Sequence, residues 1–324
     1  MKTKLDFHPK FFSCIRNYSK ATFMSDLMAG TIVGIVALPL AIAFAIASGV
    51  SPEKGIVTAI IAGFIVSFLG GSKVQIGGPA GAFIVIVYGV IQQYGIGGLT
   101  VATIIAGVLL ILLGAFKLGT VIKFIPYPVV VGFTSGIAVT IFTTQMADVF
   151  GLSFGGETVP GDFIGKWMLY FRHLDTINWW DAGVSILSVL IIMLVPKFSR
   201  RIPGSLVAII LVTAGVYALK TCLGIEGIDT IGDRFTIASQ LPKAEMPALD
   251  WEAVKNLFPI AVTIAALGAI ESLLSATVAD GMISDHHNSN TELIALGVAN
   301  MVAPIFGGIP ATGAIARTMT NINN

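Results

Sequence analysis

Two short stretches of small residues, far apart in the chain, have the composition of an anion-binding site. The first reads Gly-Gly-Pro-Ala-Gly-Ala over residues 77–82, and the second reads Gly-Gly-Ile-Pro-Ala-Thr-Gly-Ala over residues 307–314. Proline is favourable in the first turn of a helix, because the N–H that it lacks would have no partner there. The backbone N–H groups that follow stay free, and the positive end of the helix dipole attracts an anion. The two stretches therefore predict two half-helices that begin inside a membrane and face each other across an anion.

A carboxylate and a guanidinium fall within apolar sequence near these stretches. Glu271 lies in the middle of a segment that begins near residue 254, with Ser275 one turn later on the same face. Arg317 follows Pro310 by two helical turns. Ionisable residues at such depth are costly, so they usually face a cavity and have a function. We expect Arg317 to reinforce the field that attracts the anion and Glu271 to bind a coupling ion; direct pairing of the two is a compatible alternative.

Residues 285–290, Asp-His-His-Asn-Ser-Asn, contain side chains that bind metals. Adjacent histidines do not share a helical face, however, and no further cluster of ligands follows. We interpret these residues as a solvated cytoplasmic turn. Motifs for nucleotide binding, nucleophilic catalysis or metal-dependent hydrolysis do not occur in the sequence, which argues against an enzyme and against ATP-driven transport.

The overall composition places these residues in a membrane. Of the 324 residues, 55% are hydrophobic and 11% are charged, whereas soluble proteins carry about 25% charged residues. Most of the long charge-free runs would let a helix of about 20 residues cross a bilayer. The formal net charge of +1 leaves no basic surface for nucleic acid. We therefore predict an all-α polytopic membrane protein without a nucleic-acid partner.

Glycine, proline and charge divide the apolar sequence into about ten expected transmembrane segments. The run from 74 to 116 is split by Tyr-Gly-Ile-Gly-Gly at residues 94–98, so the third segment is short. Lys and Arg concentrate beside the segments on the N-terminal side, which predicts a cytoplasmic N-terminus. In an outer loop, residues 163–172 suit either a helix lying in the membrane interface or an aromatic belt. The expected segments lie near residues 26–48, 55–70, 79–93, 99–116, 127–147, 181–196, 203–220, 254–278, 291–304 and 309 onward.

The two glycine-proline stretches also indicate an internal repeat. Pro79 and Pro310 are 231 residues apart, and this offset carries Asp26, at the start of the first segment, close to the start of the eighth near 254. Such stretches also permit close helix packing, but two matched copies at a common offset favour binding. Seven segments per repeat would invert the second repeat, because seven crossings are an odd number. By the same offset the second repeat would end at about residue 451, so we expect this chain to be truncated.

Longer motifs surround these residues. They are Asp-Leu-Met-Ala-Gly at 26–30 with Pro39, the stretch from Gln75 to Phe83, Ile-Pro-Tyr-Pro-Val-Val-Val-Gly-Phe-Thr at 125–134, residues 267–290, and the closing stretch from Phe306 to Thr318. From about residue 9 to its end, the chain thereby resembles the sulfate permease (SulP) family, to which animal solute carrier family 26 and prestin belong.

The resemblance implies a 7+7 inverted-repeat transporter fold of fourteen segments, with half-helices 3 and 10 meeting at the midplane. A core domain of segments 1–4 and 8–11 would move against a gate domain of segments 5–7 and 12–14. A cytoplasmic sulfate-transporter/anti-sigma-antagonist (STAS) domain usually follows. The division implied for this chain is a cytoplasmic N-terminal segment (1–25), core segments 1–4 (26–116), gate segments 5–7 with outer loops (117–253) and core segments 8–10 (254–324), with the later segments and the STAS domain absent.

The resemblance places the anion site between the third and tenth segments, flanked by the first and eighth. Glu271 matches the acidic position associated with proton or sodium coupling, and we assign Ser275 to the coupling-ion site with it. Leu40 follows Pro39 where many members carry Gln, so one contact from the first segment would be missing. No metal or cofactor is implied. The expected substrate-binding residues are Gly78, Pro79, Ala80, Gly81, Ala82, Phe83, Gly313, Ala314, Ile315, Ala316 and Arg317.

These observations predict a secondary active transporter that carries a small inorganic anion in symport with H⁺ or Na⁺ by alternating access. Sulfate is the first candidate substrate, and bicarbonate and dicarboxylates are close competitors. A nucleobase symporter is a further alternative, because that family is similar in fold, but its sites commonly use a carboxylate where this chain has Arg317. A transport-inactive membrane sensor or motor is the alternative from another class. The resemblance also implies a homodimer, surrounded by lipid, in the inner (plasma) membrane.

Overall fold

A computed structural model describes residues 7–120, 127–198, 204–224, 227–235, 242–247 and 251–323. The chain divides into two compact units, Met1–Val130 with Ala238–Asn324, and Val131–Ile237. Residues 125 and 126 of the motif at 125–134 lie outside the described residues.

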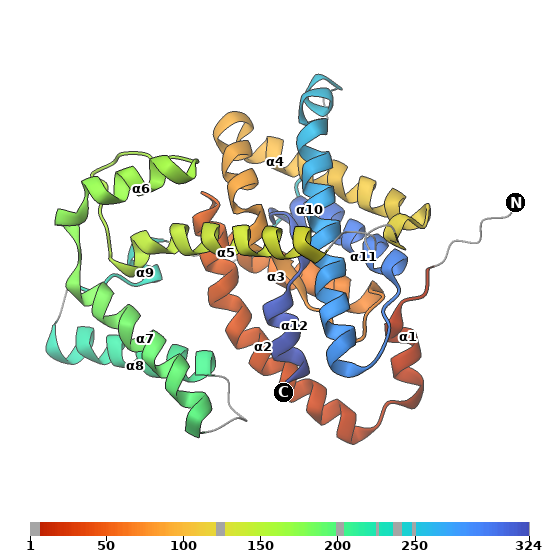
Figure 1. The fold of residues 1–324 in the computed structure, drawn as a ribbon, viewed down its shortest axis with the longest axis horizontal. Helices are drawn as coiled ribbons and strands as arrows, with labels where there is room; N and C mark the ends of the chain where they lie inside the picture. Colours follow the sequence, from red (N-terminus) through yellow and green to blue (C-terminus); the bar gives the residue numbers. More distant parts are fainter. Residues whose placement is uncertain are drawn as a thin grey trace, which may run out of the picture. The chain divides into compact units, whose positions relative to one another are not determined.

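The first unit consists of helices from both ends of the chain. Figure 1 labels its α-helices. In chain order its elements are α1 (Lys10–Cys14), η1 (Ile15–Asn17), α2 (Lys20–Ala47), α3 (Pro52–Leu69), β1 (Gly77–Pro79), η2 (Gly81–Phe83), α4 (Ile84–Ala115), α10 (Trp251–Ile283), α11 (Ser289–Val302), η5 (Ala303–Phe306), β2 (Ala311–Gly313) and α12 (Ile315–Ile322).

The second unit contains most of α5 and the helices that follow it. The helix predicted at residues 163–172 is present as α6, and its N-cap residue Asp162 accepts a hydrogen bond of 2.6 Å from Gly165 N. Its position in a membrane interface stays a prediction. The elements are α5 (Tyr127–Val149), α6 (Phe163–Arg172), η4 (Leu174–Thr176), α7 (Trp179–Phe198), α8 (Gly204–Leu223) and α9 (Ile231–Arg234).

Apolar sequence without charge forms the long helices. Among the described residues, six helices are long and apolar enough to cross a membrane: α2, α3, α4 with its preceding 3-10 turn, α7, α8 and α10. The predicted break at 94–98 falls inside α4, where Gly95 leaves the helical conformation with φ 66°. Two helices therefore meet at Gly95 within α4, at the break predicted between the third and fourth expected segments. A mostly helical membrane fold is confirmed, and the total of ten segments stays a prediction.

Helix α11 is enclosed by α3, α4 and α10 (Figure 1). It approaches α4 so closely that a Cβ atom at Gly107 would lie 2.7 Å from Gly297 O, and one at Gly297 would lie 2.6 Å from Gly107 O. Glycine at both positions lets the two backbones touch, which is the usual role of small residues between membrane helices. Helix α11 is thereby packed directly against α4 within the first unit.

This contact predicts a stability difference between two glycines of the same helix. Gly107→Ala should force α4 and α11 apart and lower the free energy of unfolding by about 1–3 kcal/mol. Gly89→Ala is the matched control, because nothing lies within 4 Å of a Cβ atom there, and alanine should be neutral or stabilising by up to about 1 kcal/mol in a helix. Thermal unfolding in detergent measures both; equal melting temperatures would contradict the close-packing role.

The two glycine-proline stretches form a two-stranded antiparallel ladder. The prolines were expected in the first turns of two half-helices, and this expectation is wrong: Pro79 lies in β1 and Pro310 immediately precedes β2. Extended segments that pair with each other satisfy backbone groups where no water is present, which two helix ends alone cannot do. The helical turns begin later, at Gly81 and Ile315. In the ladder, Gly77 faces Gly313, Gly78 faces Thr312, and Pro79 faces Ala311.

Candidate functional site

The strand ladder and the two helical turns that follow it bring the expected substrate-binding residues together. Strand β1 leads through Ala80 into η2 and α4, and β2 leads through Ala314 into α12. Most of these residues are buried, whereas Ala82 and Ile315 are half-buried and Ala316 is exposed. The ladder thus places two helix beginnings next to its paired strands, and the N-terminus of a helix is a common position for an anion.

Arg317 lies against the outer edge of β1. Its side chain is 2% exposed, and its guanidinium donates to Gly77 O at 3.5 Å and to Pro79 O. A Cβ atom at Gly78 would overlap the guanidinium, so a larger residue there would displace the Arg317 side chain. Alternate residues of a strand point their carbonyls to the same side, so one guanidinium satisfies two acceptors that the ladder leaves free. The positive charge of Arg317 is therefore fixed at the strand that precedes η2.

Asn300, which sequence reasoning missed, has the matching role at β2. Its Oδ1 accepts from Ala311 N at 2.8 Å, and its Nδ2 donates to Ala311 O at 2.8 Å and to Leu296 O at 2.9 Å. One side chain thus satisfies both backbone groups of Ala311. In a membrane interior, each unsatisfied group would cost several kcal/mol. The only signal of Asn300 in the sequence is that a side-chain amide occurs within an apolar segment.

Glu271 faces α12 without forming an ion pair with Arg317. Both residues are described, and no contact of 4.0 Å or less joins their charged atoms, so the direct pairing considered above is not formed. Among the described residues, Glu271 Oε2 and Arg317 Nε are buried atoms without a hydrogen-bond partner. The Ser275 hydroxyl donates to Thr318 Oγ1 at 3.4 Å, and Thr318 Oγ1 also accepts from Ile76 N at 3.1 Å. Ser275 therefore connects α10 to the start of α12.

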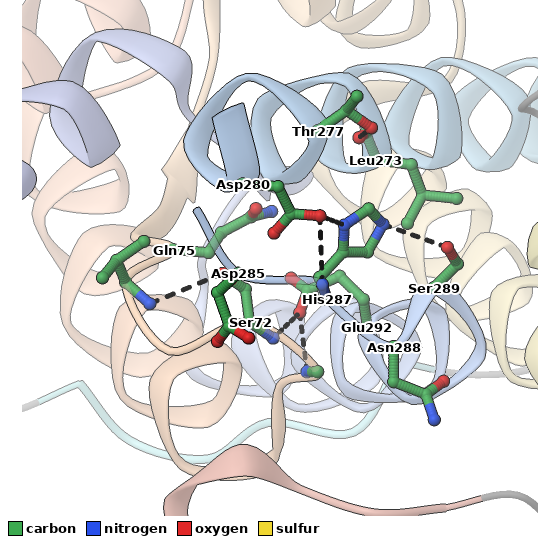
Figure 2. Close-up of polar contacts among 12 residues, drawn as sticks. Ser72, Gln75, Leu273, Thr277, Asp280, Asp285, His287, Asn288, Ser289 and Glu292 are labelled. Atoms are coloured by element: carbon green, nitrogen blue, oxygen red, sulfur yellow. Dashed lines mark hydrogen bonds and ion pairs between the residues drawn. The ribbon is translucent and has the colours of Figure 1, made fainter. Parts of the chain in front are cut away.

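The first unit contains a second buried carboxylate besides Glu271. This is Glu292, which sequence reasoning missed. Its side chain on α11 is fully buried, and its Oε2 accepts from Gly71 N at 2.8 Å and from Ser72 N at 3.2 Å (Figure 2). The Ser272 hydroxyl donates to its Oε1 at 3.5 Å. Gln75 Nε2 donates in turn to Ser272 Oγ at 2.7 Å. Three donors therefore point at Glu292.

A comparison with protein families identifies the family of the chain. The model of the sulfate permease family matches residues 23–324, which is nearly the whole chain. The chain belongs to the sulfate permease family. The resemblance inferred from the glycine-proline motifs is thereby confirmed.

Named relatives in this family are transporters rather than enzymes. The putative sulfate transporter YvdB of Bacillus subtilis (strain 168) is 45% identical over 316 residues, which cover 97% of this chain and 58% of the relative. The bicarbonate transporter BicA of Picosynechococcus sp. is 31% identical over 309 residues, covering 92% of this chain and 53% of the relative. The solved transmembrane domain of a cyanobacterial BicA superposes with a TM-score of 0.76 at 30% identity, covering 93% of this chain and 76% of that one.

The chain spans about half the length of the curated relatives that it matches. Within this half, the first unit contains both strands of the ladder, both helix beginnings, and the side chains of Arg317, Glu271 and Glu292. The first unit therefore contains all the residues that were predicted to bind the anion and its coupling ion.

Proposed function

We propose that this protein is a secondary active transporter of a small inorganic anion, with sulfate as the first candidate, coupled to H⁺ or Na⁺. The observation that carries the proposal is the meeting of η2 and α12 at the strand ladder, beside the buried guanidinium of Arg317. Backbone N–H groups and a fixed positive charge attract any small anion. The names of the sulfate and bicarbonate transporters among the relatives support the same class of substrate.

The charges around the ladder support coupling to a cation. When Glu271 and Glu292 are both ionised, they bring two negative charges against the one positive charge on Arg317, and an anion would then enter an unfavourable field. Glu292 accepts three hydrogen bonds, so its oxygens already have partners. Glu271 Oε2 has no partner among the described residues. Glu271, with Ser275 nearby, is therefore the group that we propose takes up a proton or Na⁺ when the anion binds.

The proposed transport cycle moves a core domain, residues 26–116 and 254–324, against a gate domain, residues 117–253. Both helix beginnings, Arg317 and Glu271 belong to the proposed core, so the anion and the coupling ion would travel together. A substrate and an ion that move with one rigid body are exposed to one side of the membrane at a time. We further propose a homodimer in the inner (plasma) membrane with a cytoplasmic N-terminus.

Uptake of labelled sulfate into liposomes that contain the full-length protein tests the proposal. We expect uptake above that of empty liposomes when an inward proton or sodium gradient is imposed, and loss of accumulation when an ionophore removes the gradient. Unlabelled bicarbonate and dicarboxylates, added as competitors, rank the alternative substrates. Uptake of a labelled nucleobase, but not of any anion, would replace this proposal with the nucleobase symporter. Absence of all uptake together with specific anion binding would favour a transport-inactive sensor.

A further inference from the structure

The turn between α10 and α11 encloses a histidine between a carboxylate and a hydroxyl. His287 Nδ1 lies 2.7 Å from Asp280 Oδ2, and the His287 backbone N–H donates to the same oxygen at 3.0 Å. On the other side of the ring, His287 Nε2 lies 3.0 Å from Ser289 Oγ (Figure 2). The histidine side chain is 5% exposed. Interpreting residues 285–290 as a solvated turn is therefore wrong for His287 and for Ser289, because the end of α10 and the start of α11 cover them.

This arrangement can hold an imidazole in either charge state. An ionised carboxylate only accepts hydrogen bonds, so Nδ1 carries the hydrogen that faces Asp280. A hydroxyl both donates and accepts, so Ser289 can donate to Nε2 of the neutral ring or accept from Nε2–H of the imidazolium by rotating its hydrogen. A proton can therefore arrive at Nε2 without movement of any heavier atom. Asp280 then balances the new positive charge.

Other charges near the turn are already paired. Asp285 Oδ2 lies 2.9 Å from Lys73 Nζ and 3.7 Å from Lys10 Nζ. The hydrogen bond from Lys73 lowers the pKa of Asp285 to about 2, so this carboxylate stays ionised at neutral and mildly acidic pH. On the elements that meet at this turn, the described titratable and charged groups are Asp280 on α10, Asp285 and the exposed His286 in the turn, Glu292 on α11, Lys73 before β1, Lys117 after α4, and His8 and Lys10 from the N-terminal segment.

The turn is attached to the segment that leads into β1. Asn288, the residue after His287, caps α11 and donates its N–H to Gly71 O at 2.9 Å. Glu292, one turn into α11, accepts from Gly71 N. The chain then continues from Gly71 to Gly77, where the ladder begins. A change of charge at His287 thus occurs next to the hydrogen bonds that hold residues 71–77 against α11.

We propose that Asp280, His287 and Ser289 form a proton-binding site, separate from Glu271, which adjusts anion binding to the pH on its own side of the membrane. The inference that this site adjusts anion binding rests on the proposed transport function. Lys10 reaches Asp285, so the turn lies on the same side as the N-terminal segment, which is the proposed cytoplasmic side. A proton on His287 cancels the charge of Asp280 and makes the core less negative. Lower pH on that side therefore favours the anion.

Equilibrium exchange of labelled sulfate in liposomes, with the pH set separately on each side, tests the site. Between about pH 5 and 8, the range in which histidines commonly change charge, we expect the KM for sulfate on the side of the turn to fall about fivefold or more as the pH falls. His287→Gln, which cannot titrate, should remove the part of this dependence that persists in Glu271→Gln. His286→Gln is the matched control, because this exposed neighbour should leave the profile unchanged. Asp280→Asn should move the transition to lower pH, because the imidazolium loses its counter-charge.

A wild-type pH profile in His287→Gln, or a profile flattened by His286→Gln, would overturn the proposal. If His287→Gln does not fold, exchange of the imidazole C2 hydrogen in the unaltered protein, followed by mass spectrometry, reports the ionisation of each histidine. Titration of His287 in the same range as the transport profile supports the site, and an invariant exchange rate overturns it. If no anion is exchanged by any form of the protein, the proposed function fails, and the C2 hydrogen measurement still decides whether the proton site exists.

Discussion

Glu271→Gln should strongly reduce anion uptake that is driven by a proton or sodium gradient, while exchange of one anion for another persists. Glutamine keeps the shape of the side chain and its capacity for hydrogen bonds, but it neither titrates nor carries a charge. Coupling between two bound ligands typically amounts to about 1–3 kcal/mol, so gradient-driven accumulation should fall about 5- to 150-fold. Exchange needs no net movement of the coupling ion and should continue.

Both modes of transport are measured in the same liposomes, with labelled sulfate and either an imposed gradient or unlabelled sulfate inside. Glu271→Asp is the control, because it keeps a titratable carboxyl group with a shorter side chain; it should retain dependence on the gradient at a lower rate. Unchanged dependence in Glu271→Gln would remove Glu271 from the coupling role. Loss of exchange in both variants would instead indicate damage to the ladder, since Ser275 on the same helix connects α10 to Thr318.

Much of the fold was accessible from the sequence because it depends on local composition. Charge-free runs gave the long helices, the glycines at 94–98 gave the kink at Gly95, and aromatic and basic residues gave the bounds of α6. The common offset between Pro79 and Pro310 indicated that two distant stretches would meet, and they do so in the ladder. These features follow from periodicity and from glycine and proline, which act within a few residues.

Features that depend on pairing between distant residues were not accessible. Nothing local distinguishes a proline that begins a helix from Pro79, which ends a strand whose partner lies more than 200 residues away. Likewise, Asn300 and Glu292 are recognisable only when Ala311 and Gly71 are placed beside them. The surroundings of His287 require the end of α10 to fold over the turn. The partner of Glu292 lies more than 200 residues away, whereas those of Asn300 and His287 lie 11 and 7 residues away, across turns of the chain whose course the sequence does not show.

Arg317→Ala should weaken the binding of every small anion, and the loss should depend on the charge of the anion. A fixed charge interacts with a ligand in proportion to the ligand charge, so the free-energy loss for sulfate should be about twice that for bicarbonate. Hydrogen bonds to charged groups contribute about 1.5–3 kcal/mol, which corresponds to a loss of sulfate affinity of about tenfold to more than a hundredfold. Calorimetric titration of both anions into the purified full-length protein measures the two losses.

Arg317 also holds β1 in place, because its guanidinium donates hydrogen bonds to the carbonyl oxygens of Gly77 and Pro79. Arg317→Lys separates this structural role from the electrostatic one: lysine keeps the charge but lacks the planar fork that reaches two acceptors. If charge dominates, Arg317→Lys should retain most of the affinity that Arg317→Ala loses. If the strand contact dominates, both variants should lose affinity, and in each variant the loss should be the same for sulfate as for bicarbonate. A displaced β1 misaligns the N–H groups at η2 whatever the charge of the ligand. Unchanged affinity in Arg317→Ala would exclude both roles and leave the helix beginnings alone to bind the anion.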